Sequence, residues 1–155
     1  MIFSAKAEYG VRLMVELGAH QGDEPLSLKA IAEAEELPLS YLEHVVADLK
    51  RAGLVASTRG AHGGYRLARP PQEIAMDEVV LALEGTIAPM ECFVNVPTEH
   101  VFCSHENDAG RACSTRLLWM RVQGGVVKAL QGTTLAELVE FGSSRRERET
   151  VTAGA

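Results

Sequence analysis

Residues 27–68 constrain the fold of this chain more than any other stretch, because helix and turn signals follow one another there at close spacing. Ser27 is a favourable N-cap for a short helix, and the apolar residues that follow it recur at helical spacing. That helix should end at Leu37, because Pro38 disfavours helical geometry in the residue before it. The segment therefore begins with one short helix and a tight turn.

A second helix should follow at once, since Ser40 and Glu43 have the spacing of a capping box, and it should stop at Gly53. Leu54 to Thr58 and Tyr65 to Ala68 alternate in polarity as two strands would, with a glycine-rich tip between them. Two helices joined by a tight turn and followed by a hairpin describe a winged helix-turn-helix. We therefore expect a mainly α-helical protein with a small β-hairpin, the wing.

Positive charge gathers on this hairpin, although the chain as a whole is acidic with a formal net charge of −6. Residues 50–69 contain five cations and no carboxylate; the cations are Lys50, Arg51, Arg59, Arg66 and Arg69. A surface of this kind attracts phosphate groups. The distribution of charge, more than its sum, points to nucleic acid.

The first turn of the second predicted helix carries four side chains suited to DNA: Ser40, Tyr41, Glu43 and His44. This turn enters the major groove in helix-turn-helix proteins, where polar side chains contact base edges and phosphates. Arg59, near the wing tip, can enter a narrow minor groove rich in A·T pairs. Each residue has a structural alternative: Ser40 and Glu43 as a cap, Tyr41 as a packing residue, and Arg59 as a solvated surface cation.

The sequence divides into four predicted regions. We assign residues 1–84 to the winged helix-turn-helix region, 85–113 to a cysteine-bearing loop, 114–141 to dimerisation helices and 142–155 to a disordered tail. The first region should open with a helix capped by Ser4. The long helix from Thr115 to about Leu130 contains Gly124-Gly125, a pair that favours a kink or the close approach of another helix. A homodimer seam would explain that pair.

Cys92, Cys103 and Cys113 lie in or at the end of a long segment without periodicity. Long loops of this kind inside compact domains are usually functional or disordered. An odd number of cysteines in a reducing compartment favours metal or redox chemistry over disulfide bonds. Thiolates suit iron–sulfur clusters and zinc, while burial as small apolar residues is the structural alternative.

Several classes of protein are disfavoured. The sequence has no apolar run long enough to span a bilayer and no leader with a cleavage site, so we expect a cytoplasmic protein that does not bind membranes. It has no P-loop, dinucleotide-binding glycine fingerprint or nucleophile elbow. We therefore do not expect an enzyme.

The chain resembles the Rrf2 family over residues 1–141, and most closely its iron–sulfur members. The resemblance lies in a leading helix with Lys6 and Tyr9, the segments LSYLEHVVADLKRAGLV and RGAHGGYRLAR, and a three-cysteine loop before a long helix. It implies a homodimeric transcriptional regulator that binds an inverted-repeat operator in double-stranded DNA. It also implies an iron–sulfur cluster held by the three cysteines, with [2Fe–2S] favoured over [4Fe–4S].

The resemblance also bears on the fourth cluster ligand. Glu8 stands where other members carry an acidic ligand on the first helix, so we expect Glu8 of the partner subunit to complete the set, with His105 as the alternative. The structural alternative for Glu8 is an ion pair with Arg12, one helical turn away. The rival function is a cluster-free winged-helix repressor that uses its cysteines as a redox switch or to hold a structural zinc ion.

Overall fold

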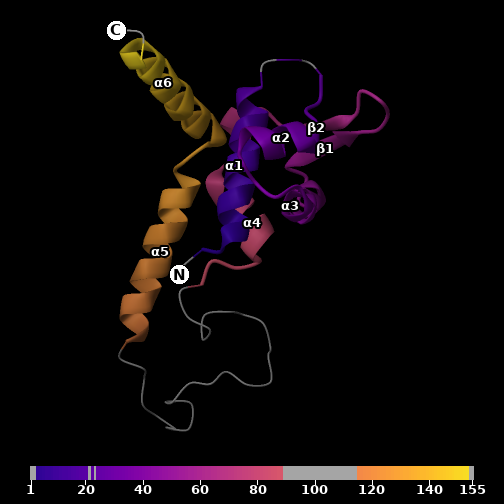
Figure 1. Cartoon of the computed structure of the whole chain (residues 1–155). Coiled ribbons are helices and arrows are strands. Elements are labelled where there is room, and N and C mark those ends of the chain that lie inside the picture. Colours follow the sequence, from indigo (N-terminus) through magenta and orange to yellow (C-terminus); the bar gives the residue numbers. More distant parts are fainter. Residues whose placement is uncertain (1–2, 21, 23, 89–114, 154–155) are drawn as a thin grey trace.

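The computed structural model describes residues 3–20, 22, 24–88 and 115–153. Its elements are α1 (Ala5–Ala19), α2 (Leu28–Ala34), α3 (Leu39–Arg51), β1 (Val55–Thr58), β2 (Gly64–Leu67), η1 (Pro71–Glu73), α4 (Met76–Glu84), α5 (Arg116–Gln131) and α6 (Leu135–Ala153). The predicted mainly α-helical fold with a small hairpin is confirmed. The wing projects on one side of α1, and α5 and α6 lie on the other (Figure 1).

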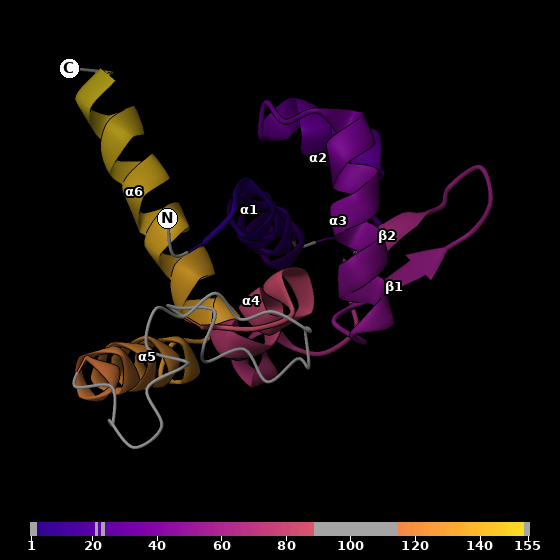
Figure 2. The ribbon, with the colours of Figure 1, turned by 90° about the horizontal axis from the view of Figure 1, so that it is seen from below.

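Helix α1 lies at the centre of the core (Figure 2). Leu13 and Met14 have no exposed surface, and they pack in one cluster with buried residues of α3 and α4, including Leu42 and Val79. Ser4 caps the helix as expected, because its hydroxyl accepts hydrogen bonds from the first-turn backbone amides. Figure 2 shows α1 surrounded by α3, α4 and α6.

The start of α3 corrects one prediction. The helix begins at Leu39, with Pro38 at the N-cap position and no side-chain cap hydrogen bond. The carbonyl of Pro38 accepts from the backbone amides of Tyr41 and Leu42, both at 3.1 Å, so the chain is already helical at the predicted cap. The expected capping box of Ser40 and Glu43 is therefore wrong.

The turn between α2 and α3 depends on one residue in an unusual backbone conformation. Glu36 has a φ of +53°, the left-handed region that residues with a Cβ atom rarely adopt. It lies between Glu35, which ends α2, and buried Leu37, whose amide donates to the carbonyl of Ala32 at 2.9 Å. This conformation reverses the chain quickly enough to bring α3 against α2.

The wing forms as predicted, with β1 and β2 antiparallel and Val55 opposite Leu67. Leu26 extends this sheet by pairing with Tyr65 through hydrogen bonds of 2.9 and 2.7 Å. Gly64 is required at this point, because a Cβ atom there would overlap the carbonyl oxygen of Leu26. The base of the wing is thus attached to the segment that leads into α2.

The C-terminal helices are joined to the rest of the fold through a second short pairing. Ala75, just before α4, forms a β-bridge with Thr134, just before α6, and Leu135 is fully buried. The hydroxyl of Thr134 accepts from the amide of Glu137, whose carboxylate accepts from the amide of Thr134, so Thr134 caps α6. Helix α6 continues to Ala153, which corrects the expectation of a frayed tail after residue 141.

The turn residue Glu36 gives a stability test. Glu36→Gly should raise the free energy of unfolding by about 0.5–1 kcal/mol. Glycine adopts a positive φ without the steric penalty that glutamate pays, and this relief should exceed the cost of the greater entropy of glycine in the unfolded chain. Glu33→Gly, in the exposed face of α2, should instead lower it by about 1 kcal/mol. Urea unfolding of the two variants measures both changes, and equal losses would contradict the role given to Glu36.

Candidate nucleic-acid interface

The first turn of α3 presents unpaired polar side chains to solvent. Ser40, Glu43 and His44 are exposed, and none makes a side-chain hydrogen bond or ion pair with another residue in the part of the chain that the structure describes. The cap that offered an alternative use for Ser40 and Glu43 does not form. These side chains are therefore available to an external partner.

Tyr41 has a structural contact as well as an exposed surface. Its ring meets the ring of Tyr9 on α1 edge to face, with centroids 5.3 Å apart and planes at 79°. Its side chain nevertheless remains 37% exposed. The packing alternative for Tyr41 is thus present in the structure, and it leaves part of the ring open on the same turn as the other three residues.

Two ion pairs fix α1 against the helix-turn-helix. Lys6 contacts Asp48 of α3 at 2.5 Å, and Arg12 contacts Glu35 at the end of α2 at 2.8 Å and also donates to its backbone carbonyl. The structural alternative for Glu8, an ion pair with Arg12, does not form, because the guanidinium of Arg12 pairs with Glu35 instead. Glu8 is exposed and has no ion pair within residues 3–88 or 115–153.

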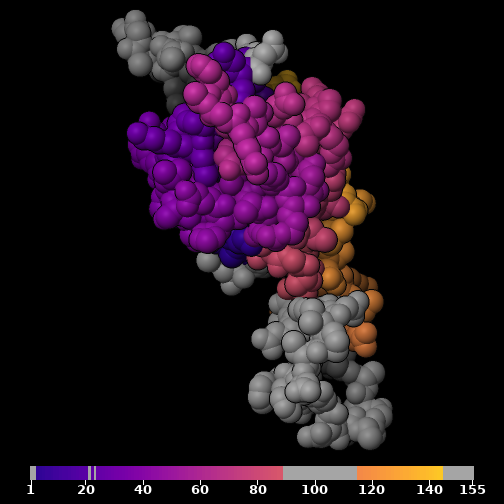
Figure 3. Space-filling model, turned by 90° about the vertical axis from the view of Figure 1, so that its right-hand side faces the viewer, coloured from indigo at the N-terminus to yellow at the C-terminus, as the bar shows by residue number. Residues whose placement is uncertain are grey.

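Fewer cations of the hairpin are unpaired than its sequence suggests. Arg51 pairs with Asp48 at 2.6 Å, and Arg69 pairs with Glu78 at 2.6 Å. The cations without a carboxylate partner among the described residues are Lys50, Arg59 and Arg66. Arg59 is exposed beside Gly60, whose φ of +117° forms the wing tip. Figure 3 faces this side of the molecule, where the surfaces of α3 and the wing adjoin.

One contact of this surface could not be read from the sequence. The ammonium of Lys50, at the end of α3, donates to the hydroxyl of Ser57 on β1 at 2.7 Å. It ties the recognition helix to the wing across the turn that separates them. Neither residue type nor spacing signals such a pairing, because it depends on how the hairpin folds back.

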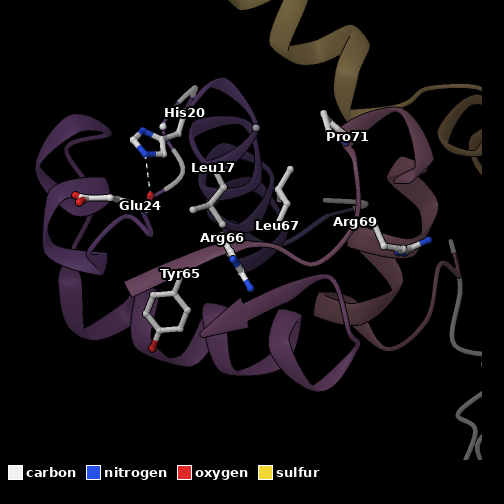
Figure 4. Close-up of a pocket in the computed structure, with 10 residues that line it drawn as sticks. Leu17, His20, Glu24, Tyr65, Arg66, Leu67, Arg69 and Pro71 are labelled. Atoms are coloured by element: carbon white, nitrogen blue, oxygen red, sulfur yellow. Dashed lines mark hydrogen bonds between the residues drawn. The ribbon is translucent and has the colours of Figure 1, made fainter. Parts of the chain in front are cut away.

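A shallow pocket of about 260 Å³ lies away from these residues, between the end of α1 and β2 (Figure 4). Leu17 and Leu67 contribute apolar surface to it, and Arg66 lies below them in the view. His20 is held to the backbone carbonyl of Glu24 at 3.0 Å. The pocket does not include the first turn of α3 or Arg59.

The metal site predicted from the cysteines lies outside the described residues, as do Cys92, Cys103, Cys113 and the alternative ligand His105. Within the described ranges no group of three metal-binding side chains comes together. Nor is any helix in those ranges both long and apolar enough to cross a membrane.

The geometry so far is that of a winged helix-turn-helix with an open recognition turn. A family model described as Rrf2, iron-dependent transcriptional regulator, matches residues 3–141. This chain belongs to the Rrf2 family. It is a DNA-binding transcriptional regulator, as its relatives are named.

Two relatives show the range of the family. The transcriptional regulator CymR of Bacillus subtilis is 37% identical over 95% of this chain and 96% of its own length. Its solved structure, whose subject is named the global cysteine regulator, matches with a TM-score of 0.72 over 91% of this chain and 98% of that chain. The solved structure of T. potens IscR is 34% identical and matches with a TM-score of 0.70, covering 92% of this chain and 88% of that chain.

The ion pair of Lys6 and Asp48 predicts that the stability of the folded protein depends on pH. The hydrogen bond from Lys6, assisted by Arg51, holds the pKa of Asp48 below its ordinary value of 3.8. The stabilisation that this pair provides is therefore complete above the ordinary pKa and is lost as the pH falls through the lowered one. Lys6→Met should raise the pKa of Asp48 toward 3.8, as measured by carboxyl NMR titration.

Lys29→Met is the matched control, because Lys29 lies 3.7 Å from Glu33 and is not among the groups that act on Asp48. It should leave the titration of Asp48 unchanged. An unaltered pKa of Asp48 in Lys6→Met would show that the ion pair does not persist in solution.

Proposed function

We propose that this regulator binds an inverted-repeat operator as a homodimer, and that an iron–sulfur cluster controls the binding. The observation that carries the DNA-binding geometry is the open first turn of α3, with Ser40, Glu43 and His44 exposed and unpaired among the described residues. In helix-turn-helix proteins this turn reads base edges in the major groove. Arg59 at the wing tip would enter the adjacent minor groove.

Helix α5 supports a homodimer. None of its residues is buried, and Leu117, Leu118 and Met120 are each more than half exposed. A Cβ atom added at Gly124 or Gly125 would meet no heavy atom within 4 Å, so the middle of this helix is open to a close neighbour. Apolar side chains of α5 that no described residue covers favour a second copy, and a two-fold axis would then give an inverted-repeat operator.

The cluster proposal rests on donor chemistry. Three cysteines, Cys92, Cys103 and Cys113, supply the soft thiolates that iron–sulfur clusters take, and Glu8 is an exposed carboxylate without an ion pair in the described ranges. We propose that the partner subunit's Glu8 completes the ligand set, with [2Fe–2S] favoured. A bound cluster would supply a centre that responds to redox state, nitric oxide or iron–sulfur status.

The position of Glu8 on α1 supports a route from ligand to DNA. Lys6 and Tyr9 flank it in sequence, and they contact Asp48 and Tyr41 on α3. A change in what Glu8 binds would therefore be passed to the recognition helix through contacts on both sides of it. A coupling of about 1.4 kcal/mol is enough to change operator affinity tenfold.

The runner-up is a regulator that uses its cysteines without a cluster, as a redox switch or with zinc. Its support is the 37% identity with CymR, whose solved structure is named that of a global cysteine regulator. The two proposals share the same DNA-binding geometry. They differ in whether the protein carries a visible chromophore.

The operator prediction is tested by binding-site selection from a random duplex library. The wild-type chain should recover an inverted repeat, and Arg59→Ala should weaken binding by about 1–3 kcal/mol with loss of A·T preference beneath the wing. Glu43→Ala should relax discrimination at one base pair by about 1–3 kcal/mol. Glu140→Ala, which removes an exposed carboxylate on α6, is the control and should change neither. Unchanged base preferences in both test variants would show that Arg59 and Glu43 do not read the operator sequence.

The cluster prediction is tested by visible absorption of anaerobically purified protein. Replacing any of Cys92, Cys103 or Cys113 by alanine should abolish the chromophore, whereas Glu8→Gln should keep it with altered absorption. Glu33→Gln, an exposed carboxylate on α2, is the control and should leave the spectrum unchanged. A colourless wild-type protein would favour the thiol or zinc alternative. A spectrum altered by His105→Ala but not by Glu8→Gln would show that His105, and not Glu8, is the fourth ligand.

A further inference from the structure

A polar groove of about 410 Å³ lies between α3, the start of α2 and the wing. Its lining includes Ser27, Lys50, Ser57, Thr58 and Arg59, and no carboxylate contributes to it. Both cations of the groove lack a carboxylate partner among the described residues. The groove therefore has a net positive charge and is lined by serine and threonine hydroxyl groups, the chemistry that suits a phosphate.

The ammonium of Lys50 is positioned without being neutralised. Its hydrogen-bond partner, the hydroxyl of Ser57 at 2.7 Å, carries no charge. The other lysines described on α1 and α2, Lys6 and Lys29, each have a carboxylate within 4 Å. Since Ser57 accepts from Lys50, its own hydroxyl hydrogen is free to donate in the groove. The Ser27 hydroxyl likewise accepts from Ala30 and keeps its hydrogen.

The location of the groove indicates which phosphate would bind in it. If the first turn of α3 lies in the major groove and Arg59 lies in the neighbouring minor groove, one sugar–phosphate strand must pass between them. The surface between α3 and the wing tip, where the polar groove lies, then faces that strand. We propose that this groove is a seat for a backbone phosphate of the operator, with Lys50 as its cation and Ser57 as the residue that positions Lys50. The inference rests on the proposed DNA-binding geometry.

The seat has a measurable signature in salt dependence. Each phosphate neutralised by a protein cation adds about 0.9 to the slope of log K against log salt concentration. Lys50→Gln should reduce the steepness of that slope by about 0.9 per protomer, so that between about 0.05 and 0.2 M salt it loses 3- to 4-fold less affinity per protomer than the wild type. The reduction should be equal on a duplex recovered by selection and on an unrelated duplex, because a phosphate contact carries no sequence information.

Fluorescence anisotropy with the two labelled duplexes measures these slopes. Lys128→Gln is the matched control, since Lys128 is exposed on α5, outside the residues that line the groove, and its slope should equal that of the wild type. Ser57→Ala should weaken binding while keeping the wild-type slope, because the charge of Lys50 remains. Lys50 is exposed, and unchanged thermal unfolding of Lys50→Gln would show that the fold is retained.

A second measurement locates the phosphate. Neutral methylphosphonate groups placed one at a time along the selected duplex should include one position that weakens the wild type and leaves Lys50→Gln unaffected. A wild-type slope in Lys50→Gln, or equal weakening of both proteins at every position, would overturn the seat while leaving DNA binding intact. Failure of the wild type to bind either duplex would instead overturn the proposed function.

Discussion

The close packing of α1 against α4 and α6 is the constraint on which the other parts of the structure depend. Gly10 lies so near Leu83 of α4 that an added Cβ atom would overlap that side chain, and Gly18 is similarly close to Val139 of α6. These two glycines allow one central helix to contact both the DNA-binding unit and the C-terminal helices. Larger residues would push the C-terminal helices away from the helix that also supports α3.

The same helix gives the recognition surface its rigidity. Contacts from α1 reach the first turn of α3 through Tyr9 and Tyr41, its last turns through Lys6 and Asp48, and the α2–α3 turn through Arg12. Ion pairs at partly exposed positions contribute little individually. Their arrangement along one helix matters more, because it restricts rotation of α3 at several points rather than one.

Much of the fold could be predicted because it depends on local chemistry. Ser4 located the start of α1, and glycines located the wing tip. The cap of α3 was misplaced because two signals overlapped: Pro38 is the N-cap of the helix, two residues before Ser40, which matched a capping pattern. The longer α6 was missed because residues after 141 lack apolar periodicity, although they remain helical to Ala153.

The candidate site was harder to predict, because its important contacts join residues far apart in the chain. Local spacing offered Glu8 as an alternative partner for Arg12, yet Arg12 pairs with Glu35, which lies 23 residues along the chain. This pairing leaves Glu8 without Arg12 as a partner. The bond from Lys50 to Ser57 depends in the same way on how the hairpin folds back. Sequence spacing identified which residue types were present, but tertiary packing decided which of them stayed free.

The pairing of Ala75 with Thr134 has a consequence for how the cysteine segment can vary. This bridge, together with the bond from Gln123 to the carbonyl of Ile87 at 2.8 Å, holds the chain on both sides of the segment independently of the segment itself. For a flexible loop between fixed ends, doubling the length costs only about 0.6 kcal/mol. The DNA-binding unit can therefore keep its shape while the cysteine-bearing segment changes in length and in the spacing of its cysteines. One scaffold is in this way compatible with cysteine segments of different lengths at a single place.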